Sequence, residues 1–94
     1  MNEKKPLFRT GRIVSTPGAM EAITATGEEP LEFIQRHRTG DWGDVDDHDR
    51  QENDLSVTKG FRILSAYHLK DGTKIWVITE YDHSITTILL PEEY

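Results

Sequence analysis

The C-terminal third of the chain carries the pattern that most limits its fold. Residues 61–69 and 74–81 are rich in β-branched and aromatic side chains and flank the pair Asp71-Gly72. Such a pair between two such segments is typical of a β-hairpin, because both residues accept the positive φ angles of a type I′ turn. A two-residue turn at this point pairs His68 with Ile75. The pattern therefore predicts an antiparallel hairpin.

A third strand extends the hairpin. Residues 85–90 are mostly apolar, follow a turn at 82–84, and end at Pro91, which cannot donate to a strand ladder. We therefore expect a C-terminal three-stranded β-meander. Both faces of its middle strand are apolar, so helices can cover one face. The other face needs the third helix, an N-terminal strand or a second copy of the chain, which makes a homodimer through the sheet one alternative.

Helix signals precede the meander. Thr16-Pro17 and Gly27 bracket one helix, and a second extends from about Pro30 to His37. A third begins at Asp44 or Asp46 and ends near Lys59-Gly60, while residues 11–15 suit a brief strand. The fold class predicted is α+β, with two or three short N-terminal helices packed on a three- to four-stranded antiparallel sheet.

Composition narrows the class of protein. The chain has 94 residues, 35% of them hydrophobic, which suits one domain over residues 11–94. Residues 1–10 are basic and are expected to be a flexible arm, the only part suited to nucleic acid. The longest apolar runs have about three residues, so no membrane span is expected. No export signal stands out either, and we expect a cytoplasmic protein.

Charge is concentrated in one block. Residues 41–54 hold seven acidic residues against Arg50 alone, which accounts for the whole formal net charge of −6. Cysteine is absent, and the acidic spacing does not match a calcium loop, so we expect no metal and no cofactor. The acids at the start of the third helix can cap it. We also expect the block to contact the basic surface of a protein partner, through Asp41, Trp42, Asp44, Asp46 and Asp47.

Trp42 has two interpretations. It can plug the core from its loop, or it can supply the apolar anchor of the partner contact.

The second hairpin offers an alternative function. Glu80 and His83 lie near its turn, and Arg62 is the single arginine of the sheet region. A general base, a general acid and a cation on a compact sheet are what a small metal-independent ribonuclease requires. The alternative is therefore a ribonuclease-like domain of the barnase or RelE kind, active or degenerate.

Four segments together resemble a family of small bacterial proteins described as plasmid-related. They are G-R-I-V-S-T-P-G-A at 11–19, G-D-W-G-D at 40–44, R-I-L-S-A-Y at 62–67 and W-V-I-T-E-x-D-x-S-I-T-T-I-L-L-P-E-E-Y at 76–94. The resemblance implies carriage on plasmids, integrative elements or genomic islands, but no activity. Many such sequences have arginine where this chain has His83, which weakens a phosphate-binding role there.

These expectations favour a binding protein over an enzyme. The function predicted is that of a non-enzymatic interaction protein of a bacterial mobile element. It would inhibit a host defence or nucleic-acid-binding protein through the loop that contains Asp41, Trp42 and Asp44, which we call the acidic loop. Carboxylates can occupy a pocket that receives phosphates.

Overall fold

Within residues 5–94, the range that the computed structural model describes, four strands form one sheet and three helices accompany it. The α+β class expected from the sequence is confirmed. In chain order the elements are β1 (Arg12–Ser15), α1 (Pro17–Thr26), α2 (Pro30–Arg38), α3 (Asp47–Lys59), β2 (Ile63–His68), β3 (Lys74–Thr79), the 3-10 turn η1 (Tyr81–His83), β4 (Ile85–Leu89) and the 3-10 turn η2 (Pro91–Glu93).

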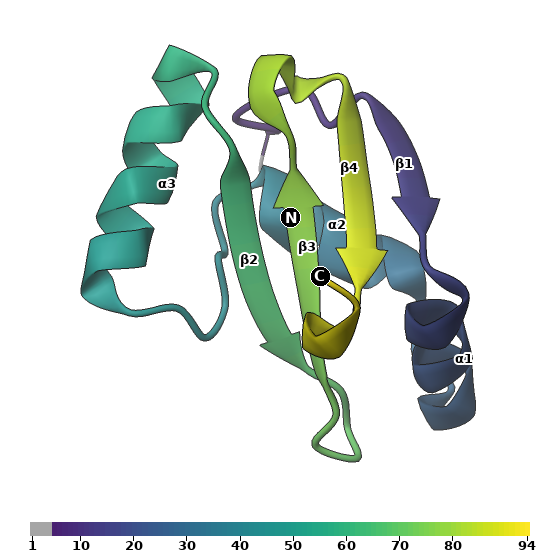
Figure 1. Cartoon of the computed structure of the whole chain (residues 1–94). Coiled ribbons are helices and arrows are strands. Elements are labelled where there is room, and N and C mark those ends of the chain that lie inside the picture. The colour runs from purple at the N-terminus through teal and green to yellow at the C-terminus, as the bar shows by residue number, and fades with distance from the viewer. Residues whose placement is uncertain (1–4) are drawn as a thin grey trace.

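The strand order is β1-β4-β3-β2, and the sheet is mixed. β2, β3 and β4 form the predicted antiparallel meander. The prediction of an entirely antiparallel sheet is wrong, because β1 runs parallel to β4, with Ile13 beside Thr86. A hairpin turn makes neighbouring strands antiparallel, but three helices and two strands separate β1 from β4, so no turn sets their direction. Both strands begin at the same end of the sheet (Figure 1).

The β2–β3 turn is one residue longer than a type I′ turn. Gly72 N–H donates to Leu69 O at 2.9 Å, and Leu69 N–H donates to Thr73 O at 2.8 Å. Gly72 has a φ of 90°, whereas Asp71 is not among the residues of positive φ. A type I′ turn needs positive φ at both positions, so a three-residue loop with a glycine bulge forms instead. His68 therefore pairs with Lys74, and the predicted pairing with Ile75 is wrong.

The predicted ends of the first and third helices are confirmed, whereas α2 ends at Arg38, one residue after the predicted His37. Thr16 Oγ1 accepts the Ala19 N–H at 3.1 Å at the start of α1, and Asp46 does the same for Asp49 N–H at 2.8 Å at the start of α3. Gly27 and Gly60 end these two helices in the left-handed conformation. Local capping chemistry therefore sets where α1 and α3 begin and end.

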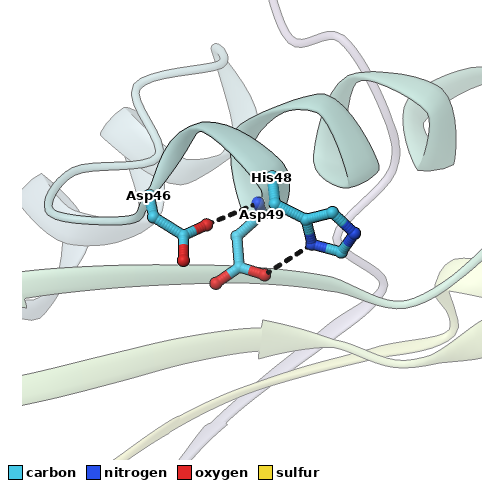
Figure 2. A group of neighbouring side chains, drawn as sticks. All are labelled: Asp46, His48 and Asp49. Carbon is cyan, nitrogen blue, oxygen red and sulfur yellow. Dashed lines mark hydrogen bonds and ion pairs between the residues drawn. The ribbon is translucent and has the colours of Figure 1, made fainter.

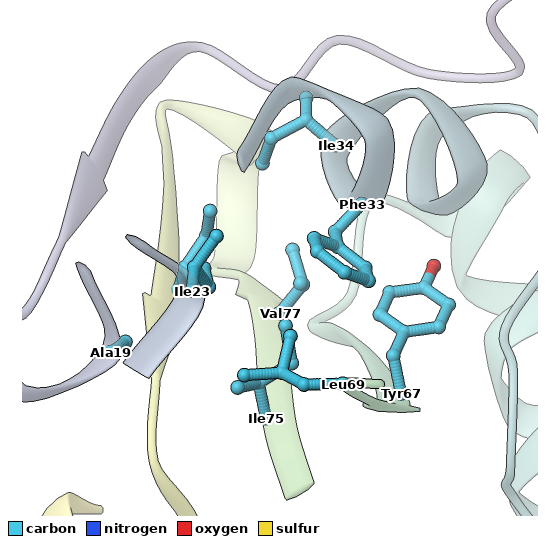
Figure 3. Packing of buried hydrophobic residues seen from close by; sticks show 9 residues of the cluster. Ala19, Ile23, Phe33, Ile34, Tyr67, Leu69, Ile75 and Val77 are labelled. Carbon is cyan, nitrogen blue, oxygen red and sulfur yellow. The ribbon is translucent and has the colours of Figure 1, made fainter. Parts of the chain in front are cut away.

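One face of the sheet carries the main core, beneath α1 and α2. Ile23 of α1 and Phe33 of α2 meet Tyr67, Ile75 and Val77 of the sheet there (Figure 3). A second, smaller cluster joins Phe8, Trp42 and Ile63. α1 and α2 thus form one layer and the sheet the other, while α3 lies beside β2 (Figure 1).

The opposite face of the sheet is partly covered by the C-terminus of the same chain. Ile78 and Leu89 on that face are 2% and 6% exposed. The rings of Trp76 and Tyr94 meet edge to face, with centroids 5.7 Å apart. A second copy is therefore not needed to bury these two side chains, and the homodimer through the sheet stays a prediction.

The N-terminal segment is bound to the domain over residues 7–10. Leu7 N–H donates to Arg38 O at 2.7 Å, the Phe8 side chain is buried, and Thr86 Oγ1 donates to Thr10 O at 2.7 Å. The domain thus begins before residue 11, inside the range expected to be a flexible arm. Residues 1–4, the first part of that predicted arm, lie outside the described residues.

Candidate functional site

The acidic loop runs along the outer edge of β2. Trp42 O accepts the Ala66 N–H at 3.0 Å, and Asp44 N–H donates to Ala66 O at 2.7 Å. Gly43 lies between them with a φ of 75°, and a Cβ at this position would stand 2.1 Å from Ala66 O. Only glycine permits both this φ and this approach. The loop is consequently held against the sheet edge by backbone contacts.

α3 covers the next part of the same edge. Asn53 Nδ2 donates to Leu64 O at 2.8 Å, and Leu64 N–H donates to Asn53 Oδ1 at 3.1 Å. The amide side chain thus replaces a neighbouring strand. Few apolar side chains of this segment are buried: Val45 and Val57 pack against the Phe8 cluster, whereas Leu55 is 47% exposed. The reason is that α3 docks on a polar strand edge through Asn53 and does not lie over an apolar sheet face.

Trp42 is buried, being 1% exposed. Its Nε1–H donates to Asp54 Oδ1 at 3.0 Å, and its ring stacks on Phe8 with centroids 6.1 Å apart. The interpretation of Trp42 as a core plug is confirmed. The interpretation as an apolar anchor for a partner is corrected, because this ring has no surface left to offer in this conformation.

Asp41 is engaged within the chain. Its Oδ2 lies 2.7 Å from Arg36 Nε, and this hydrogen bond raises the pKa of Arg36. Gly43 N–H donates to Asp41 Oδ1 at 3.2 Å, and Tyr67 Oη donates to the Asp41 carbonyl at 2.6 Å. Burial raises the pKa of Tyr67, so its hydroxyl keeps its proton as a donor. Asp41 therefore stabilises the loop from within.

Asp44 and the acids at the start of α3 point outward. The Asp44 side chain is 69% exposed, with one oxygen 3.5 Å from His68 Nδ1. Asp46 caps α3, and Asp47 is 98% exposed with Arg50 at 4.0 Å. Asp41 and Asp44 together line a pocket of about 390 Å³, which we call the Asp44 pocket; its other walls are Arg36, Gly43, Ala66, Tyr67 and His68. Two of the predicted contact residues are thus brought to one pocket.

Asp46, His48 and Asp49 form a cluster at the start of α3 (Figure 2). One ligand atom from each can lie within 4.8 Å of the others, and all three residues are exposed. Carboxylate and imidazole are ligands for divalent metals. However, one oxygen of Asp46 is already bound by the Asp49 N–H, and a solvated helix cap explains the arrangement equally well.

A buried chain of hydrogen bonds, which is not among the predictions from the sequence, links α2 to the sheet. Thr86 Oγ1 donates to Thr10 O at 2.7 Å, so the Thr79 hydroxyl must donate to Thr86, at 2.6 Å. His37 Nε2 must then carry a proton and donate to Thr79, at 2.8 Å. The other nitrogen of the neutral ring, Nδ1, therefore accepts from the Ser65 hydroxyl at 2.6 Å.

These hydrogen bonds fix the neutral His37 ring in one tautomer, with its proton on Nε2. Burial, followed by the nearby charge of His83, lowers the pKa of His37 to about 3. Although a serine beside a histidine suggests a nucleophile and its base, both Ser65 and His37 are 0% exposed. No substrate can reach them in this conformation, so the pair is structural.

The sequence does contain a pattern that indicates these buried hydrogen bonds. His37 lies four residues after Phe33 and so shares the buried face of α2. Thr79 and Thr86 stand opposite one another, at buried positions of mostly apolar strands. Polar residues at such core positions require partners within the protein.

The residues of the ribonuclease alternative are held separately. His83 Nε2 lies 3.0 Å from Phe61 O, and Arg62 contacts Tyr94 through a hydrogen bond and a cation–π contact at 5.2 Å. Among residues 5–94 no hydrogen bond or ion pair joins the side chains of Glu80, His83 and Arg62. The alternative stays a prediction, which incubation with RNA alongside Glu80→Ala would test.

Comparisons with protein-family models, with curated proteins and with solved structures yield no match to this chain. Within the described part of the chain, none of the helices has the length and apolarity needed to cross a membrane.

Proposed function

We propose that the protein is a non-enzymatic binding module that receives a basic side chain of a protein partner in the Asp44 pocket. The observation that carries the proposal is the position of Asp44, whose exposed carboxylate lines a pocket that Asp41 also lines. A lysine or arginine of the partner can pair with Asp44 there, as a charge-assisted hydrogen bond.

The rigid loop supports this role. The backbone on both sides of Gly43 is bound to Ala66, and Asp41 is bound to Arg36. A site that is already ordered loses less conformational entropy when a partner binds. Asp44 is thus presented at a fixed place on the β2 edge.

The first turn of α3 adds long-range attraction. Asp47 and Asp49 are exposed next to the loop, and the surrounding block carries the whole net charge of the chain. Complementary charge raises the association rate and makes it sensitive to salt. A host nucleic-acid-binding protein, basic where it meets phosphates, is the class of partner that we propose, in keeping with the resemblance to proteins of mobile elements.

Capture experiments with matched variants test the proposal. The triple variant Asp44→Asn, Asp47→Asn, Asp49→Asn removes the outward charge, while Glu21→Gln, Glu32→Gln, Glu92→Gln removes equal charge from exposed positions elsewhere. Bacterial proteins retained by the wild type and the control, released by salt and lost with the aspartate variant would support the proposal. Equal retention by all three proteins would contradict it.

A further inference from the structure

A second pocket lies where the N-terminal segment meets the start of β1. Its volume is about 610 Å³, and its lining includes Phe8, Arg9, Thr10, Arg12, Arg38 and Ser84. We call it the arginine pocket. Three arginines line it, and none of the described residues that line it is acidic. The pocket shares no lining residue with the Asp44 pocket, so its function is independent of the one proposed above.

The arginines of this pocket differ from the others in their partners. Among residues 5–94, Arg9, Arg12 and Arg38 have no ion pair, and the only side-chain bond that joins any of them to a neighbour is from Arg38 Nε to Gln35 Oε1, at 2.8 Å. The arginines outside the pocket each have a partner: Arg36 has Asp41, Arg50 has Asp47, and Arg62 has Tyr94. Three positive charges are therefore gathered in one place without compensation from described carboxylates.

The backbone around these arginines is held in place. Leu7, two residues before Arg9, donates its N–H to Arg38 O at 2.7 Å. Arg12 N–H donates to Ser84 O at 2.9 Å. Thr10 O, between the two N-terminal arginines, accepts from Thr86. Residues far apart in the sequence thus converge on one site before any ligand binds, which lowers the entropic cost of binding.

Guanidinium groups are suited to binding phosphate. Each presents a planar fork of N–H donors that matches two phosphate oxygens, and three of them suit a ligand with more than one phosphate charge. The volume of about 610 Å³ falls within the usual range of small-molecule pockets.

Charge elsewhere on the chain limits the size of the ligand. The chain has 11 basic and 17 acidic residues, so outside the arginine pocket the acidic excess is larger still. The acidic start of α3 lies toward the end of the sheet opposite to that where β1 and β4 begin (Figure 1). A long polyanion would meet this repulsion, whereas a compact anion would not.

We propose that the arginine pocket binds the phosphate groups of a compact phosphorylated ligand, with a pyrophosphate unit as the smallest complete example. Arg9 and Arg12 approach from the N-terminal segment and Arg38 from the end of α2, so that phosphate oxygens are held from two sides.

Calorimetric titration of the full chain with inorganic pyrophosphate, at constant ionic strength, tests the proposal. We expect saturable binding at one site. Arg9→Gln and Arg12→Gln should each weaken it about tenfold, since a charged hydrogen bond is lost at an exposed position. Arg50→Gln is the matched control, because it removes the same charge at the start of α3. Circular dichroism of each variant checks that the fold is kept.

Two further titrations identify the source of the phosphate. Binding of ADP with the same dependence on Arg12 would support the proposal and indicate a nucleotide, whereas binding of pyrophosphate alone would indicate the free anion. An oligothymidylate that binds more tightly than pyrophosphate, with the same dependence on Arg12, would overturn the compact ligand in favour of single-stranded nucleic acid. No saturable binding, or equal weakening by Arg50→Gln, would overturn the site itself.

Discussion

Asn53 satisfies both backbone groups of Leu64 at once, with its amide nitrogen 2.8 Å from the carbonyl and its amide oxygen 3.1 Å from the N–H. β2 is the outer strand on this side of the sheet, where backbone groups would otherwise stay unpaired. An unpaired edge is a template for pairing with another chain. The Asn53 side chain therefore pairs one part of the β2 edge, and the acidic loop pairs the part around Ala66.

Replacing this side chain should expose the edge. Asn53→Ala leaves the Leu64 N–H and carbonyl without their partner, and we expect the free energy of unfolding to fall by about 2 kcal/mol. Urea denaturation measures the loss, and light scattering at increasing concentration should show self-association. Gln51→Ala changes an exposed residue of the same helix and should lower stability little or not at all. If the two variants behave alike, the Asn53 pairing does not stabilise the fold.

How far the sequence predicts the structure depends on whether a signal is local. Thr16, Asp46 and the glycines after α1 and α3 act on neighbouring residues, and the helix ends that they predict are confirmed. The direction of β1 depends on a strand more than 60 residues away in the sequence, so local chemistry could not give it.

The candidate site shows the same limit. Exposed acids after Trp42 could be read from composition, and Asp44 and Asp47 are indeed exposed. The burial of Trp42 depends on Phe8 and on Asp54 of α3, and the arginine pocket depends on residues 9, 12 and 38 meeting in space. Contacts between residues so far apart in the sequence depend on the folded structure and cannot be predicted from local patterns.

Gly43 should be the most sensitive position of the acidic loop. In Gly43→Ala the new methyl group would stand 2.1 Å from Ala66 O, so the loop must leave the β2 edge. Gly27→Ala is the control, because Gly27 also has a positive φ, of 76°, yet no atom within 4 Å of an added Cβ. We expect the control to cost about 1 kcal/mol of unfolding free energy and Gly43→Ala clearly more. Equal losses in denaturation experiments would contradict the close approach.

The direction of the buried hydrogen bonds predicts the effect of removing one hydroxyl. Thr79→Val keeps the shape of the side chain but leaves the His37 Nε2–H without an acceptor and Thr86 without a donor. We expect a loss of about 2 kcal/mol in the free energy of unfolding. Thr87→Val, on the opposite face and partly exposed, should change it little. The measurement is chemical denaturation. A loss of stability confined to Thr87→Val would show that the buried hydrogen bonds of Thr79 contribute nothing to the free energy of unfolding.

His37 should make the stability depend on pH below neutrality. Its pKa is about 3 in the folded protein, against a usual value of 6.5, so between these values the unfolded chain binds the additional proton. The contribution of the neutral ring is therefore complete above pH 6.5 and falls as the pH drops toward 3, at about 1.4 kcal/mol per pH unit.

Denaturation midpoints between neutrality and about pH 5, above the usual pKa range of carboxylates, isolate this effect. His37→Gln should lower stability at neutral pH and also flatten the slope, because glutamine takes up no proton. His48→Gln, at an exposed position, should leave the slope of the wild type in place. The change of stability with pH, and not the stability at any one pH, distinguishes these outcomes. A His37→Gln protein that keeps the full slope would show that another group titrates, and that the buried ring is not the source of the pH dependence.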